Sequence, residues 1–285
     1  MIYTQTARFD TGRAMTEDEM RKAAPSIFAV EAHESRSDRF SAIPTIEVLR
    51  GLAGEGFFPV AARQSGTRDM SRKEFTKHAV RLRRFDNAEK YKVDDTVFEI
   101  NLKNANDGTC QYDLAAALFR IACLNSMVTQ LSEVDAVKIR HSGEAVPKVI
   151  EGTYRVLQSA QLALAAPAEW SQIRMPREAQ LALAEAVHTV RFADAEGKVT
   201  TPILPEQLLQ ARRVEDRGSD LWTVANVLQE HVIRGGDTAW GRDANNRRRR
   251  TTTRAVNGIE GDMKLNRAIW VLSERMAGML RSQAA

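Results

Sequence analysis

The chain has 285 residues, of which 43% are hydrophobic, and a net charge of only +4. This length allows one large domain or two small ones, and we expect two. Two cysteines are too few for a disulfide framework in a chain of this length, so we expect a cytoplasmic protein. The longest apolar run, LAAALFRIACL, is far shorter than a membrane span, and residues 1–15 contain no apolar signal core, so we expect no membrane partner.

The charge is concentrated in two segments. Residues 59–84 carry eight Lys or Arg against two acids, and residues 242–254 carry six Arg against one acid. The rest of the chain is therefore acidic. Two basic segments on an acidic body are the pattern expected of a surface that binds a polyanion.

Residues 1–40 are mostly polar and predict an N-terminal arm, with a core region at 41–131 after it. Pro44 begins a predicted helix over 44–56 with an apolar stripe that contains Ile46, Leu49 and Leu52. Residues 57–64 and 71–84 are predicted strands, joined by a turn rich in Gly, Ser and Asp. Together they predict a β-hairpin.

The second strand of this hairpin has two different faces. Val80 and Leu82 point to one side, whereas Arg81 and Arg83 point to the other. A third strand is predicted over 96–105. A helix is predicted over 110–128, because its apolar residues fall three and four apart, and this helix would cover the inner face of the strands. The predicted core is therefore α-β-β-β-α.

Residues 132–285 are predicted to be mostly helical, since their large apolar residues recur three and four apart. A long Arg-rich loop is predicted over 235–258. The predicted fold class is α+β, with a short antiparallel β-sheet in the α-β-β-β-α core and a mostly helical C-terminal region.

No converging catalytic groups are visible in the sequence. The five His are scattered, which favours structural roles, and neither a P-loop nor a GxGxxG motif is present. Asp94, Asp95 and Glu99 near Lys103 resemble the acids and lysine of a metal-dependent nuclease. Glu99 and Lys103, however, stand four residues apart on a strand, about 13 Å from each other. We therefore prefer the interpretation that both pair with hairpin residues across strands, and we predict no catalytic residue, metal site or cofactor.

The remaining signal is cationic. A run of charge is often only a solvated strand face, but this strand lacks acids of its own and a second basic cluster occurs later in the chain. Tyr91, Tyr112, Trp240, Phe57 and Phe58 are the candidates for stacking on bases. The predicted nucleic-acid-binding residues are Arg63, Lys77, Arg81, Arg83, Lys103, Arg242, Arg247, Arg248, Arg249, Arg250 and Arg254.

Several stretches resemble the phage/plasmid-like protein family, which carries a domain of unknown function. They are IPTIEVLRGLAGEGFFPVAARQ, FTKHAVRLRR, FEINLKNANDGTCQYDLAAALFRIACLNSMV, LWTVANVLQEHVIRGG and MKLNRAIW. The resemblance covers most of the chain, from about residue 25 to 275. The predicted core order is also similar to that of single-strand annealing proteins of the Redβ/RecT class.

This likeness implies a non-enzymatic, ATP-independent protein that binds and anneals single-stranded DNA for recombination. It implies a homo-oligomeric ring or filament with the backbone in a basic groove and the bases free to pair with the complementary strand. The start of the helix predicted near Cys110 would offer free N–H groups to a phosphate. A partner exonuclease that supplies the single strand is left open.

Two alternatives stay open beside annealing. The first is a metal-dependent nuclease that uses Asp94, Asp95 and Glu99. The second is an interaction protein of a mobile element that blocks a host defence and turns its basic segments toward an acidic partner.

Overall fold

The structure is a computed structural model that describes residues 13–34, 43–85, 96–120, 126–128, 137–140, 144–242 and 246–284. The chain divides into two compact units. Unit 1 contains residues 1–122 and 130–163, and unit 2 contains residues 123–129 and 164–285.

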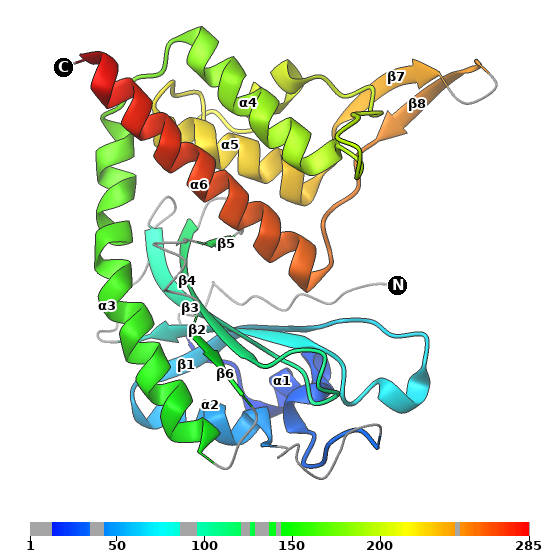
Figure 1. The fold of residues 1–285 in the computed structure, drawn as a ribbon, viewed down its shortest axis with the longest axis vertical. Coiled ribbons are helices and arrows are strands. Elements are labelled where there is room, and N and C mark those ends of the chain that lie inside the picture. The colour runs from blue at the N-terminus through cyan, green and yellow to red at the C-terminus, as the bar shows by residue number, and fades with distance from the viewer. Residues whose placement is uncertain are drawn as a thin grey trace. The chain divides into compact units, whose positions relative to one another are not determined.

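Unit 1 is built on an antiparallel sheet (Figure 1). Its strands lie side by side in the order β1, β2, β3, β4, and the short strand β6 pairs with β4. A short 3-10 turn, η2 (Met70–Arg72), lies in the connection between β1 and β2. The strand bounds are β1 Phe57–Gln64, β2 His78–Arg84, β3 Thr96–Asn104, β4 Tyr112–Arg120 and β6 Val137–Ile139.

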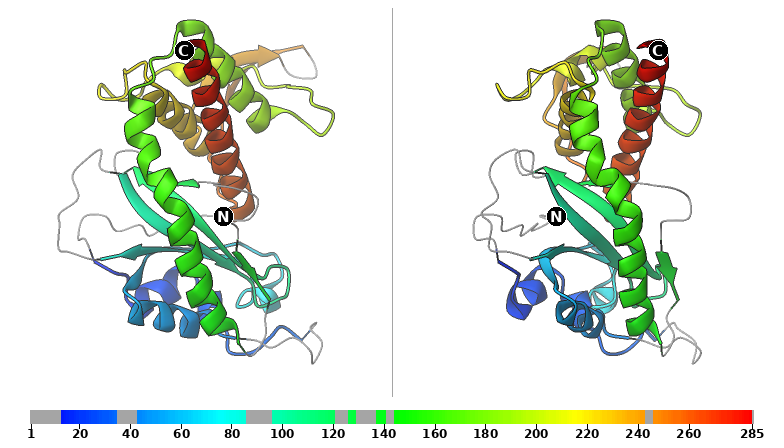
Figure 2. Two further views of the ribbon diagram at one scale, coloured as in Figure 1. Left: turned by 60° about the vertical axis from the view of Figure 1, so that its left-hand side comes forward. Right: turned by 90° about the vertical axis from the view of Figure 1, so that its left-hand side faces the viewer.

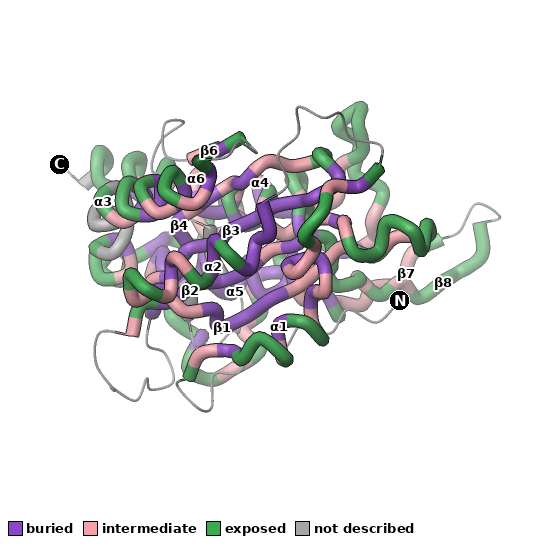
Figure 3. Tube along the Cα trace, turned by 90° about the horizontal axis from the view of Figure 1, so that it is seen from below, coloured by how far each residue is buried: buried purple, intermediate pink, exposed green. Residues whose placement is uncertain are grey.

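One face of this sheet forms the hydrophobic core of unit 1. Val80 and Leu82 of β2 are fully buried there, as are Ile100 and Leu102 of β3. The core is completed by residues of α1 (Glu17–Ala23), η1 (Pro25–Phe28), α2 (Thr45–Gly54) and the first half of α3 (Ala145–Ser171). The strands of the sheet are accordingly among the most buried segments in Figure 3.

The predicted N-terminal arm is partly folded. Thr16 caps α1 in a capping box with Glu19, and Met20 of α1 is 3% exposed. Ile27 of η1 is completely buried in the same core. At least residues 17–28 of the arm are therefore part of unit 1.

One predicted element is wrong. Residues 112–120 form strand β4 rather than the first part of a helix over 110–128. Leu114 and Leu118 are four residues apart, and this spacing satisfies both a helix period of 3.6 and a strand period of 2. Pairing with β3 from Thr96↔Arg120 to Lys103↔Asp113 decides for the strand, and tertiary contacts of this kind override local propensity.

Unit 2 is mostly helical, as predicted. It contains α4 (Arg177–Phe192), η3 (Pro205–Leu209), α5 (Leu221–Arg234), α6 (Ile259–Ala284) and the short strand β5 (Ser126–Val128). Trp170 packs against Trp270 with ring centroids 4.6 Å apart and against Trp222 at 6.2 Å. The described part of the chain contains no helix with the length and apolarity that a bilayer crossing requires.

The segment predicted as an Arg-rich loop over 235–258 forms a β-hairpin. Its strands are β7 (Thr238–Arg242) and β8 (Arg248–Thr252), and they pair in antiparallel register. Figure 1 and the left view of Figure 2 show these strands extending away from the helices of unit 2. The mixed α+β class, with an antiparallel sheet and a helical C-terminal region, is confirmed.

Candidate nucleic-acid interface

The second face of the β1–β4 sheet carries charged residues that we call the sheet cluster: Arg81, Arg83, Glu99 and Lys103, which are buried, and Asp113, which is half-buried. The Glu99 side chain is fully buried and accepts hydrogen bonds from both arginines. Arg81 Nη2 lies 3.0 Å and Arg83 Nη2 lies 2.6 Å from its Oε1. One carboxylate therefore holds two guanidinium groups, which are the charge-assisted contacts that a buried carboxylate requires.

The second ion pair of the sheet cluster joins neighbouring strands. Lys103 of β3 lies directly opposite Asp113 of β4 in the strand register, and its Nζ is 3.1 Å from Asp113 Oδ2. The prediction that Glu99 pairs with hairpin residues is confirmed. Lys103 instead pairs with a residue of β4, a strand that the sequence interpretation did not contain.

Alanines on β4 explain how these large side chains fit. Glu99 lies opposite Ala117, and Asn101 lies opposite Ala115. Cross-strand neighbours on one face are about 5 Å apart at Cβ, so a small residue on β4 leaves space for a long one on β2 or β3. The alanines of β4 thus accommodate the charges of the sheet cluster.

The prediction that Arg81, Arg83 and Lys103 form an exposed cationic ribbon is wrong. Their exposed fractions are 8%, 3% and 7%. The strand facing was correct, because Val80 and Leu82 do point into the apolar core. The error lay in the extent of the pairing: Glu99 holds both arginines, and Lys103 pairs with Asp113 of β4, a strand that was not predicted.

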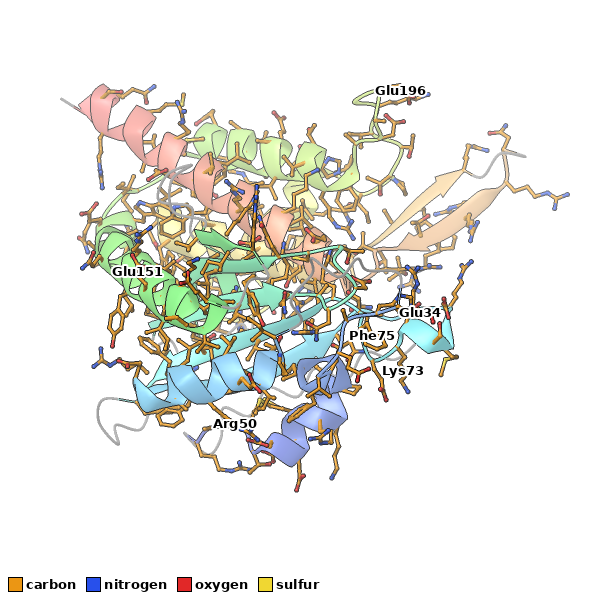
Figure 4. The ribbon with its side chains drawn as sticks, turned by 60° about the horizontal axis from the view of Figure 1, so that its bottom comes forward. Glu34, Arg50, Lys73, Phe75, Glu151 and Glu196 are labelled. Atoms are coloured by element: carbon orange, nitrogen blue, oxygen red, sulfur yellow. The ribbon has the colours of Figure 1, made fainter. Side chains whose placement is uncertain are left out.

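The other predicted cations of unit 1 lie at one end of the hairpin. Arg63 is half-buried and pairs in register with Ala79, and Lys77 is half-buried just before β2. The connection between β1 and β2 is basic at its surface, where Lys73 is exposed (Figure 4). Phe75 of this connection contacts His33 edge-to-face, with centroids 5.4 Å apart.

The turn between β3 and β4 replaces the predicted helix start. Asp107 Oδ1 accepts hydrogen bonds from the backbone N–H and the side-chain hydroxyl of Thr109. Gly108 has φ +72°, a left-handed conformation that suits glycine. Because β4 follows, the predicted phosphate site at a helix N-terminus near Cys110 does not exist in the structure.

The predicted nucleic-acid-binding cations that are exposed all lie in unit 2. We call residues 238–252 the arginine hairpin; it comprises β7, β8 and the turn between them. Each predicted arginine of the second basic segment has an exposed side chain: Arg242, Arg247, Arg248, Arg249, Arg250 and Arg254. Figure 3 shows strand β8 as an exposed segment.

The register gives the arginine hairpin two different faces. Trp240 lies opposite Arg250, and Arg242 lies opposite Arg248, so these four side chains share one face. All four are exposed, and the Arg248 guanidinium lies 4.5 Å from the centre of the Trp240 ring. We call this the tryptophan face.

The opposite face of the arginine hairpin rests on its own unit. Ala239, Gly241 and Thr251 are half-buried there. A Cβ added to Gly241 would lie 3.1 Å from Cβ and Cγ of Pro202, so the proline ring packs closely against the hairpin at this glycine. Packing on this side leaves the tryptophan face directed toward solvent.

Polar contacts fix the base of the arginine hairpin. Asp237 Oδ1 lies 2.6 Å from His231 Nδ1 and 3.0 Å from Arg212 Nη2. His231 Nε2 lies 2.8 Å from the Gln210 carbonyl, so both ring nitrogens face acceptors. Burial alone would raise the pKa of Asp237, but the contacts with His231 and Arg212 outweigh it and lower that pKa. Sequence reasoning missed these three residues, which are close only in the folded unit.

The candidate stacking residues have different positions. Tyr112 and Phe57 are buried in the core of unit 1, Phe58 is half-buried, and Tyr91 lies outside the described residues. Trp240, by contrast, is 59% exposed. It is therefore the candidate that an external base can reach.

The nuclease alternative loses one of its three acids. Glu99 is fully buried and paired with two arginines, so it does not face solvent as a metal ligand would. Asp94 and Asp95 lie outside the described residues. Within the described residues, no three His, Cys, Asp or Glu side chains are grouped closely enough to hold a metal ion.

Comparison with known proteins places the chain in a family. A family model described as Domain of unknown function (DUF932) matches residues 32–270. The Escherichia coli (strain K12) proteins described as UPF0380 protein YafZ and UPF0380 protein YfjQ are 41% and 40% identical to it over 269 residues, which is 94% of this chain and 94% of each relative. No solved structure shows a significant match. The resemblance to a family with a domain of unknown function is confirmed: this chain belongs to the DUF932 family.

Proposed function

We propose that this protein binds single-stranded DNA and anneals complementary strands independently of ATP, with the arginine hairpin as its main contact to the phosphates. The observation that supports the proposal is the row of exposed arginines from Arg247 to Arg250, on a ribbon that also presents the exposed Trp240. Cations that bind phosphates release condensed counterions, and aromatic rings stack on bases irrespective of sequence.

The sheet cluster does not contact DNA in this proposal. Arg81 and Arg83 already neutralise Glu99, and opening those contacts would leave a buried carboxylate without its partners. Arg63 and Lys77, which are half-buried, stay secondary candidates.

A single arginine hairpin is too short to bind a long strand tightly. Each of its strands has five residues, a length of about 17 Å. Several hairpins that act together raise the effective concentration at the strand and thus the avidity. We therefore propose a homo-oligomer, either a ring or a filament, in which successive copies hold one DNA strand and leave the Watson–Crick edges of its bases free to pair.

The test is a salt titration of oligonucleotide binding with a triple variant, Arg248→Ala, Arg249→Ala and Arg250→Ala. For single strands, log Kd rises with log salt by about 0.7 for each phosphate contacted, so loss of three contacts lowers this slope by about 2. The matched control removes three exposed cations elsewhere in unit 2: Arg177, Lys264 and Arg275. It should leave the slope unchanged.

Annealing is measured with complementary fluorescent oligonucleotides, without ATP. Wild type should accelerate pairing above the spontaneous rate, and the triple variant should lose most of this acceleration. Electron microscopy with and without oligonucleotide tests for rings or filaments. Kd values on the order of 10⁻⁴ M at physiological salt, no tighter than nonspecific binding, would contradict the proposal and favour an acidic protein partner.

A further inference from the structure

We infer that Trp240 is a stacking platform for an unpaired nucleobase, and that the flanking arginines of the tryptophan face hold the phosphates on either side of that base. This inference rests on the proposed function and adds to it the chemical feature that distinguishes single-stranded DNA from other polyanions. A cationic ribbon alone binds any of them by charge.

Trp240 differs from the other tryptophans of the chain. Trp170, Trp222 and Trp270 are exposed by only 3%, 8% and 1%, and they pack against one another in unit 2. Trp240 is 59% exposed and lies on the projecting hairpin. A large aromatic side chain normally contributes to stability through burial, and Trp240 contributes little in this way.

The strand register surrounds the indole with cations. Arg250 is its direct cross-strand partner, Arg242 is two residues along the same strand, and Arg248 is its diagonal neighbour. Neighbours of these kinds lie roughly 5 to 8 Å apart on one face of a ribbon. A base that stacks on the indole would therefore have Arg250 on one side, across the hairpin, and Arg242 on another side, further along β7.

Arg248 also orients the ring. Its guanidinium carbon lies 4.5 Å from the indole centroid, within the range of a cation–π contact. The contact covers one face of the ring, and Trp240 as a whole remains 59% exposed. A nucleobase can then stack on the remaining ring surface, with its phosphates at Arg242 and Arg250.

The rest of the arginine hairpin keeps this side outward. Gly241 is close to Pro202 on the opposite face, and the Gln207 side chain donates a hydrogen bond to the Thr238 carbonyl at 3.3 Å. Rotating the ribbon to bury Trp240 would require Arg249 and Gly241 to exchange sides with it, because alternate residues of a strand face opposite ways. The platform is thus preorganised.

Unpaired bases are required by this geometry. In a duplex each base is already stacked on its neighbours, whereas a single strand offers a free π-face. Stacking on an aromatic ring contributes about 5- to 150-fold in affinity per base. We therefore expect a preference of this size for a single strand over a duplex, and for DNA over a polyanion without bases.

The experiment compares two ligands of the full-length protein, oligothymidylate and inorganic polyphosphate. Both are expected to bind, but only oligothymidylate should quench the solvent-exposed tryptophan emission. Trp240→Ala should weaken oligothymidylate binding about 5- to 150-fold and leave polyphosphate binding unchanged. Trp240→Phe keeps an aromatic ring, so it should retain most of the affinity while the quenching disappears.

The outcomes separate the two proposals. If oligothymidylate binds but Trp240→Ala binds it as tightly as wild type, or if polyphosphate quenches equally, the stacking inference is overturned and the proposed function stands. If neither ligand binds, the proposed function and the inference both fail. Circular dichroism of each variant checks that the fold is kept, which we expect for an exposed side chain.

Discussion

Glu99→Gln tests the sheet cluster most directly. The substitution keeps the shape of the side chain but removes the negative charge that Arg81 and Arg83 share. The side chain of Glu99 is 0% exposed, that of Arg81 is 10% exposed and that of Arg83 is 3% exposed. The two arginines therefore lose their carboxylate at a site that water hardly reaches. Removal of one partner from a buried ion pair costs about 3–5 kcal/mol.

This loss is a large part of the total stability of a typical domain, which is about 5–15 kcal/mol. For a protein of this size it corresponds to a fall of the melting temperature on the order of 10 °C. The assay is urea and thermal unfolding of the full chain, followed by far-ultraviolet circular dichroism. Emission of Trp170, Trp222, Trp240 and Trp270 reports unit 2 separately, because all four lie there.

Two controls define the result. Glu144→Gln removes an exposed carboxylate, 75% accessible, from its ion pair with Lys148, and should leave the free energy of unfolding almost unchanged. The combined replacement of Arg81 and Arg83 by Met and of Glu99 by Leu should recover much of the stability, because an apolar set avoids desolvating charges. A Glu99→Gln protein that unfolds within about 0.5 kcal/mol of wild type would refute the assignment of Glu99 as the counter-ion.

Further predictions concern close packing and acid sensitivity. Gly152→Ala should lower stability by about 1–3 kcal/mol in thermal unfolding, because the new Cβ would lie 2.6 Å from Val137 Cγ1. Gly278→Ala is the control: Gly278 has open space around it in helix α6, so this substitution should stabilise the protein by up to about 1 kcal/mol. The lowered pKa of Asp237 contributes stability that is present above the ordinary aspartate pKa near 4 and is lost as the pH falls through the folded value. Asp237→Asn should therefore flatten the fall of melting temperature in acid, and a fall as steep as in wild type would contradict this role.

The structure also reverses an expectation for Arg81 and Arg83. An exposed pair that binds DNA could be replaced by Ala with a loss of DNA binding and little loss of stability. Because both are buried against Glu99, we now expect a destabilised unit 1. Binding by the arginine hairpin in unit 2 should persist wherever the double variant folds.

The sequence by itself determined the strands and helices in which the spacing of apolar residues fits only one type of secondary structure. Alternation along β2 and β3 placed Val80 and Ile100 on the core side, and the spacings of three and four predicted α4, α5 and α6. It also located the exposed arginines of the second basic segment, since four consecutive arginines with one acid in the segment are typical of a solvent-facing surface.

Only the tertiary structure decided that a strand, and not a helix, follows β3. It also decided which cations are paired with acids. Leu114 and Leu118 fit a helix and a strand equally well, and the ladder with β3 selected the strand. The same ladder brought Asp113 to Lys103, and the pairing of β2 with β3 brought Glu99 to Arg81. Cross-strand partners are distant in the chain, so their charges balance only after the register is set.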